Sequence, residues 1–160
     1  MDNGHYEVGV HIADVSHYVR PNTKLEEEAY ERATSVYLVD RTIPMLPEML
    51  SNGVCSLRPN EDKLTFSAVF EMNENGQVIS EWMGKTIIHS QRRFTYEEAQ
   101  ERIESGEGDL AKELTILNNI AKKLKDARFK NGALSFETEE VKFNLDDDGK
   151  PLGVYTKERK

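Results

Sequence analysis

A stretch of alternating apolar residues, 63–72, constrains the fold most strongly. In KLTFSAVFEM the apolar side chains of Leu64, Phe66, Ala68 and Phe70 recur at every second position. That period is typical of a β-strand with one apolar face. The following NENG is a favourable hairpin turn, and residues 77–92 can return as the partner strand. The sequence therefore predicts an antiparallel β-hairpin.

Two further strand regions flank this hairpin in the sequence. Residues 6–13, YEVGVHIA, alternate only loosely and carry Val, Ile and Tyr, which predicts a largely buried strand. Near the other end, 134–145 and 152–156 predict a second hairpin across DDDGKP. Residues 38–53 contain Pro44 and Pro47 and are predicted to be rich in loops.

Capping residues predict the helices. Thr23 can cap a helix over about 24–35. Thr95 and Glu98 form a capping box for a helix over about 96–105. A longer helix follows to about residue 130, with an apolar stripe that contains Leu110, Leu114, Leu117, Ile120, Ala121 and Leu124. Strands and helices in this order predict an α+β fold, with a mixed or antiparallel sheet and packed helices.

Composition limits the classes of function. The 160 residues fit one domain, and 29 acidic against 21 basic residues leave a net charge of −8. This balance argues against autonomous binding of a polyanion by charge alone, but not against a pocket that holds a few nucleotides by stacking. Because no signal peptide or long apolar run occurs, we expect a cytoplasmic protein without a membrane segment. The single Cys55 is expected to be a buried or half-buried thiol.

The segment GVHIADVSHYV raises the question of a local catalytic cluster. It contains His11, Asp14, Ser16 and His17 within seven positions. On a strand, His11 lies on the opposite face from Ile12 and Asp14, so the pattern does not bring a triad together. We interpret Asp14 and Ser16 as residues that satisfy backbone donors at the end of the strand, with a direct chemical role for Asp14 as the alternative.

Acidic runs do not predict a metal site. LEEEAYE is typical of a helix N-terminus and LDDDGK of a hairpin tip, and FETEE is the third such run. DDDG lacks the ligand spacing and the closing Glu of a calcium loop. We therefore expect no metal ligands within these 160 residues.

Three aromatic residues stand next to breaks in regular structure. They are Tyr37, Tyr96 and Phe136. An aromatic ring at such a position can stack on a nucleobase. Taken alone, an aromatic residue at such a position is more often a core or rim residue.

The segments GVHIADVSHYV, ATSVYLVDRTIPMLPEMLSNGVCSLRPNEDKLTFS, HSQRRFTYEEA and NGALSFETEE together carry a resemblance. They closely resemble the catalytic RNB domain of the ribonuclease II family of 3′-to-5′ exoribonucleases, in its ribonuclease R branch. The resemblance runs over nearly all 160 residues. It implies a processive enzyme that releases nucleoside 5′-monophosphates from the 3′ end of single-stranded RNA with magnesium.

The resemblance also implies roles for the three aromatics. Tyr37 and Phe136 match the two sides of the clamp that stacks the terminal nucleotides. Tyr96 matches a tyrosine that helps to recognise the ribose 2′-hydroxyl. Asp14 is not one of the four aspartates that bind magnesium in the family.

The same resemblance predicts what residues 1–160 lack. They would be a part of the catalytic domain, truncated at both ends, without the flanking oligonucleotide-binding barrels. The four-aspartate motif would precede Met1, so we expect this chain alone to be inactive and to bind no magnesium. The alternatives are a non-catalytic RNA-binding module and a regulatory scaffold domain. No obligate protein partner is implied.

Overall fold

The computed structural model describes residues 1–134 and 140–157. The chain divides into two compact units. The first comprises Met1–His17 and Cys55–Leu134, and the second comprises Tyr18–Val54 and the described residues that follow position 134. A short helix, α1 (Val15–Tyr18), spans the first boundary between them.

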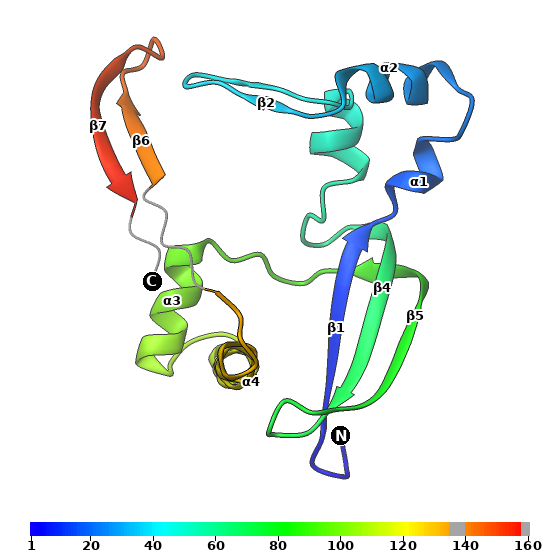
Figure 1. Ribbon diagram of the computed structural model, residues 1–160, viewed down its shortest axis with the longest axis vertical. Helices are drawn as coiled ribbons and strands as arrows, with labels where there is room; N and C mark the ends of the chain where they lie inside the picture. The colour runs from blue at the N-terminus through cyan, green and yellow to red at the C-terminus, as the bar shows by residue number, and fades with distance from the viewer. Residues whose placement is uncertain (135–139, 158–160) are drawn as a thin grey trace. The chain divides into compact units, whose positions relative to one another are not determined.

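The first unit is built on a three-stranded antiparallel sheet in the order β1-β4-β5 (Figure 1). The strands are β1 (Tyr6–Ala13), β4 (Asp62–Met72) and β5 (Val78–His89). The predicted hairpin is confirmed as β4–β5. Gly76 occupies the turn with φ +77°, a conformation that glycine adopts without steric cost.

The two faces of this sheet differ from the expected pattern. Thr65 and Ser67 are fully buried, and both hydroxyls lie within hydrogen-bond distance of the Thr86 hydroxyl. The apolar face is open instead, with Ile12 and Ile87 each 68% exposed and Phe66 50% exposed. The prediction of a largely buried first strand is therefore wrong: no residue of β1 is buried, because its apolar side chains lie on the open face with Phe66.

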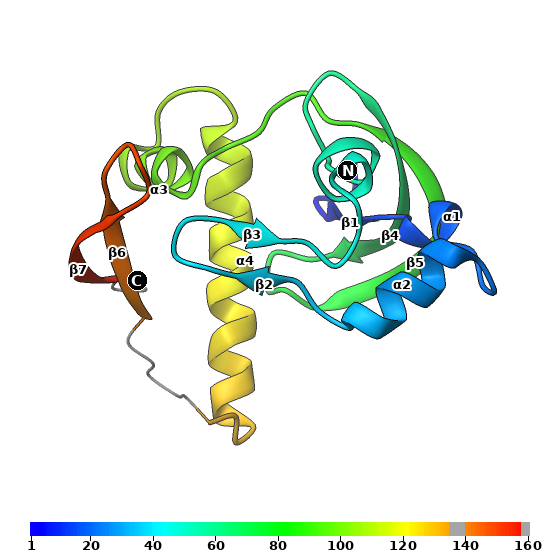
Figure 2. The same ribbon diagram turned by 90° about the horizontal axis from the view of Figure 1, so that it is seen from above.

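Helices α3 (Tyr96–Ser105) and α4 (Ala111–Lys130) complete the first unit and pack against each other (Figure 2). The capping box at Thr95 is confirmed, with both of its hydrogen bonds present. Helix α4 also contacts the β4–β5 turn, where Lys123 Nζ donates to the Glu74 carbonyl at 2.7 Å. Of the predicted apolar stripe on α4, Ile120 is buried, whereas Leu117 and Leu124 remain partly exposed.

The second unit contains one predicted helix and shorter elements that the sequence did not predict. Helix α2 (Lys24–Arg32) is capped by Thr23 as expected, but it ends early because Ala33 adopts the left-handed region. Strands β2 (Val36–Tyr37) and β3 (Thr42–Ile43) form a small hairpin, and a π-helix, η1 (Met49–Val54), follows.

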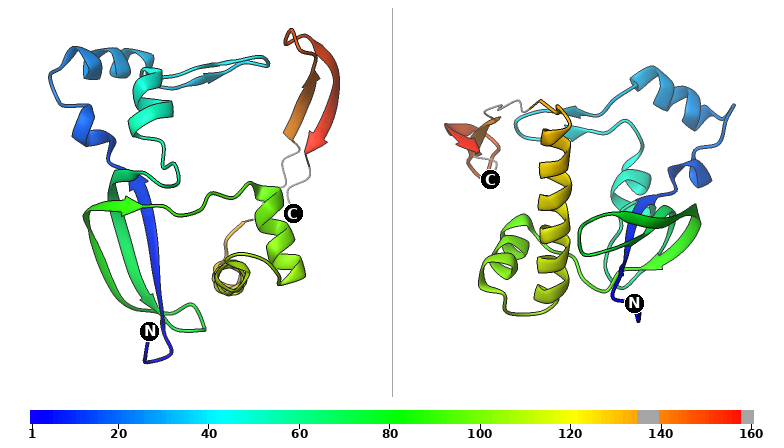
Figure 3. Two further views of the ribbon diagram at one scale, coloured as in Figure 1. Left: turned by 180° about the vertical axis from the view of Figure 1, so that it is seen from behind. Right: turned by 60° about the horizontal axis from the view of Figure 1, so that its bottom comes forward.

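The remaining strands, β6 (Glu140–Leu145) and β7 (Pro151–Lys157), form the predicted second hairpin (Figure 3). All described strand pairs are antiparallel, which agrees with the predicted α+β class. Across the described parts of the chain, no helix is both long and apolar enough to cross a membrane.

Candidate nucleic-acid interface

A cleft of about 750 Å³ opens in the first unit between the end of β5 and the start of α3. Residues 91–99 form most of its wall, and Pro59 and Asn60 complete it. The backbone N–H of Asn60 donates to the Ser90 carbonyl at 2.6 Å, which holds the two wall segments together. The lining includes two arginines, a phenylalanine and a tyrosine, a combination suited to stacking and to anion binding.

Tyr96 is the first residue of α3 and lines this cleft. Its side chain is 85% exposed, so its ring belongs to the surface and not to the core. A phenol can both donate and accept a hydrogen bond, and its ring presents an apolar face. The position is therefore accessible to a ligand in the cleft.

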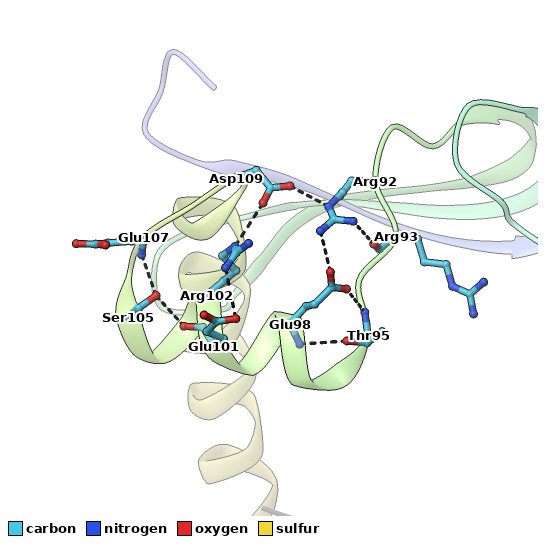
Figure 4. A network of polar contacts seen from close by, with 9 residues as sticks. All are labelled: Arg92, Arg93, Thr95, Glu98, Glu101, Arg102, Ser105, Glu107 and Asp109. Carbon is cyan, nitrogen blue, oxygen red and sulfur yellow. Dashed lines mark hydrogen bonds and ion pairs between the residues drawn. The ribbon is translucent and has the colours of Figure 1, made fainter.

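A polar network fixes the backbone that leads into Tyr96 (Figure 4). Arg92 donates from Nε to Asp109 at 2.9 Å and from a terminal nitrogen to Glu98 at 3.1 Å. Glu98 in turn accepts from the backbone N–H of Thr95 at 2.8 Å. Arg102 adds a contact to Asp109 at 3.3 Å. The network ties the segment before α3 to the α3–α4 junction.

Each charged group in this network stabilises the charged form of its partners. The backbone N–H of Thr95 and the Arg92 guanidinium lower the pKa of Glu98. Arg92 likewise lowers the pKa of Asp109, and the two carboxylates raise the pKa of Arg92. Arg92 also stacks on Phe94, with the guanidinium carbon 4.5 Å from the ring centroid. Both carboxylates therefore remain charged well below neutral pH.

Sequence reasoning found only part of this network. It identified Thr95 and Glu98 from their capping spacing, but it missed Arg92 and Asp109. These two residues are seventeen positions apart. Their contact depends on the path of the loop after α3, and no local periodicity in the sequence predicts that path.

In the GVHIADVSHYV segment, Asp14 and Ser16 are in contact, but His11 does not join them. The carboxylate of Asp14, 6% exposed, accepts from the Ser16 hydroxyl and pairs with Lys85 Nζ at 2.8 Å. The Lys85 ammonium, followed by the Ser16 hydroxyl, lowers the pKa of Asp14. His11 instead contacts the Ser67 hydroxyl at 2.6 Å on the other face. The expected separation of His11 from Asp14 is confirmed.

The other predicted site residues lie elsewhere. Tyr37 belongs to β2 of the second unit and is 79% exposed. Phe136 lies outside the described residues. The stacking roles expected for both stay predictions. Cys55 is half-buried, as expected, and burial raises the pKa of its thiol.

Carboxylates, histidines and Cys55 do not gather into a metal site within residues 1–134 and 140–157. No group of three such side chains there could hold an ion. The described residues therefore do not fit the magnesium centre that the family resemblance implies.

Comparison with protein families assigns the chain to a known class. The RNB domain family matches residues 1–160, the whole chain. The chain belongs to the RNB family. It is 44% identical over 161 residues to "Exosome complex exonuclease RRP44" of Mus musculus, covering 99% of this chain and 17% of that protein. It is 42% identical to "Ribonuclease R 1" of Lactococcus lactis, covering 99% of this chain and 20% of that protein.

Solved structures agree with this RNB assignment. Mycoplasma genitalium RNase R in complex with double-stranded RNA matches with a TM-score of 0.86 and 26% identity, over 94% of this chain and 28% of that one. Its complex with ribose methylated single-stranded RNA matches with a TM-score of 0.87 and 25% identity, over 96% and 25%. The chain spans about a fifth of the length of the curated relatives it matches.

Proposed function

We propose that this RNB chain is part of a 3′-to-5′ exoribonuclease that hydrolyses RNA to nucleoside 5′-monophosphates. The similarity of the whole chain to proteins named exonuclease and ribonuclease R carries the proposal. The cleft in front of α3 supports it, because its wall offers the aromatic and cationic side chains that a single strand needs.

Within this function the chain's own residues bind and orient the RNA. Tyr96 exchanges a hydrogen bond with the 2′-hydroxyl of a ribose, the group that distinguishes RNA from DNA. Tyr37 and Phe136 stack on the terminal bases and thereby hold the 3′ end in place. The Arg92 network holds the start of α3 and so fixes the position of the Tyr96 backbone.

Magnesium would supply the activated water and the stabilisation of the leaving oxygen. Because the described residues do not fit such a site, we place its ligands outside them and derive no step through the ion. The 160-residue chain alone is accordingly proposed to be inactive.

A nuclease assay tests the proposal. A 5′-labelled single-stranded RNA is incubated in magnesium with this chain and, separately, with a longer polypeptide that contains it. We expect only the longer polypeptide to shorten the RNA stepwise from its 3′ end. Degradation by the 160-residue chain alone would place the metal ligands within it and contradict our account of the site.

The assay also separates the two alternatives. If neither polypeptide degrades RNA but both retain it on a filter, the domain is a non-catalytic RNA-binding module. If neither degrades nor retains RNA, it is a regulatory scaffold. Either result overturns the proposed activity.

A further inference from the structure

Two adjacent arginines in the wall of the cleft have different surroundings. The charge of Arg92 is balanced by Glu98 and Asp109, and its guanidinium also donates to the Arg93 carbonyl at 2.9 Å. Arg93 is exposed, and no carboxylate in the described part of the chain forms an ion pair with it. Its side chain points away from Asp109 and Glu98 (Figure 4). Arg93 is therefore the cation of this wall that is available to a ligand.

Tyr96, which lies near Arg93 in the chain, indicates which class of ligand Arg93 can bind. Arg93 lines the same cleft as Tyr96, three positions along the chain. A ribose whose 2′-hydroxyl meets the phenol carries backbone phosphates on both sides, and a guanidinium binds a phosphate through two parallel hydrogen bonds. A cation beside a sugar-reading phenol thus suits a nucleic-acid backbone.

We propose that Arg93 binds one backbone phosphate of the RNA, adjacent to the ribose that Tyr96 contacts. The proposal rests on the proposed function, because it needs RNA in this cleft. Arg92 does not share this role, since two carboxylates already occupy its guanidinium. Arg93 binds the substrate directly, whereas Arg92 holds the backbone from which Arg93 projects.

A carboxylate on the same wall should have the opposite effect on RNA affinity. Glu97 lines the cleft and is exposed in the first turn of α3. Its charge repels a phosphate held by Arg93. Glu97→Gln should therefore tighten RNA binding, and a gain of affinity cannot result from misfolding.

The test measures the salt dependence of binding. A fluorescent oligouridylate is titrated with the wild-type chain and with Arg93→Ala over a series of salt concentrations. For a single strand, each neutralised phosphate contributes a slope of about 0.7 in log K against log salt. We expect Arg93→Ala to weaken binding and to reduce the slope by about that amount, while Arg93→Lys keeps most of the slope.

A matched control removes the same charge elsewhere. Arg128 is an exposed arginine in the last turn of α4 and does not line the cleft. Arg128→Ala should leave the slope unchanged. An unchanged slope in Arg93→Ala, or an equal reduction in both variants, would overturn the Arg93 proposal alone. A wild-type chain that fails to bind the oligouridylate would instead contradict RNA binding at the cleft, and the Arg93 proposal with it.

Discussion

Tyr96 carries two chemical groups that separate variants can remove one at a time. Tyr96→Phe keeps the ring and loses the hydroxyl. We therefore expect the binding free energy to weaken by about 0.5–1.5 kcal/mol for RNA, and not to change for DNA of the same sequence. Tyr96→Ala also loses stacking, which costs about 1–3 kcal/mol for both. Binding of matched ribo- and deoxyribo-oligonucleotides measures the difference. An equal loss of affinity for RNA and DNA in Tyr96→Phe would contradict recognition of the ribose 2′-hydroxyl by the phenol.

Removal of Asp14 and removal of Lys85 should reduce stability by different amounts, because the two partners of this ion pair differ in burial. The Asp14 side chain is 6% exposed, whereas that of Lys85 is 60% exposed. Lys85→Met leaves a buried carboxylate without its cation, while Asp14→Asn leaves an ammonium that water can solvate. We therefore expect Lys85→Met to lower the thermal unfolding midpoint more than Asp14→Asn does.

The double variant completes this comparison as a cycle. Asp14→Asn with Lys85→Met should be more stable than Lys85→Met alone, because no unpaired carboxylate remains. If the two single-variant losses simply add, the pair does not interact in the folded chain.

At the scale of elements, the start of α3 depends on its cap. The Thr95 hydroxyl accepts from the Glu98 backbone N–H at 3.1 Å. Thr95→Ala removes this acceptor and should destabilise the first unit by about 1 kcal/mol, within a range of about 0.5–2 kcal/mol. Thr95→Ser is the matched control, because a serine hydroxyl can cap in the same way. Chemical denaturation measures both variants, and an equal loss in them would contradict the capping role.

The same region should respond to acid. The pKa values of Glu98 and Asp109 are lowered from ordinary values of 4.5 and 3.8 by the Thr95 backbone and by Arg92. Carboxyls with a lowered pKa stabilise the fold above the unfolded-state value, and this stabilisation is lost as pH falls through the folded-state value. Protection of the amides in the first turn of α3, relative to their intrinsic exchange rate at each pH, should therefore decrease below about pH 4.5. In Arg92→Met the loss of protection over this pH range should be smaller, because the folded-state pKa values of both carboxyls move back toward their ordinary values. A loss as large as in the wild-type chain would contradict the network.

Elements with a regular pattern were predictable from the sequence, and elements held by irregular contacts were not. The β4–β5 hairpin follows from the period of two in 63–72 and the NENG turn, and α3 follows from its capping box. Strands β2 and β3 are too short to show a period, and η1 lies in a segment with prolines at 44 and 47. The burial of Thr65 and Ser67 was missed because alternation shows which side chains share a face, not which face is packed.

At the scale of the whole molecule, the net charge does not determine whether the cleft can bind RNA. The net charge of −8 gives no general attraction for RNA. The cleft overcomes this locally, because the Glu98 and Asp109 carboxylates are paired with Arg92 while Arg93 stays available. Prediction from composition weighed against binding of a polyanion by charge alone, and the local arrangement of the cleft depends on contacts that composition does not contain.

Mapping of the RNA-binding surface tests the central claim most directly. The claim is that the cleft before α3 binds RNA through its ribose. An isotope-labelled chain is titrated with an oligouridylate and with its 2′-deoxy counterpart, and the amide chemical shifts are followed. We predict that the largest changes cluster at residues 91–99 and at Asn60, and that they are smaller with the deoxy strand. Changes confined to other surfaces, or equal changes with both strands, would contradict the account.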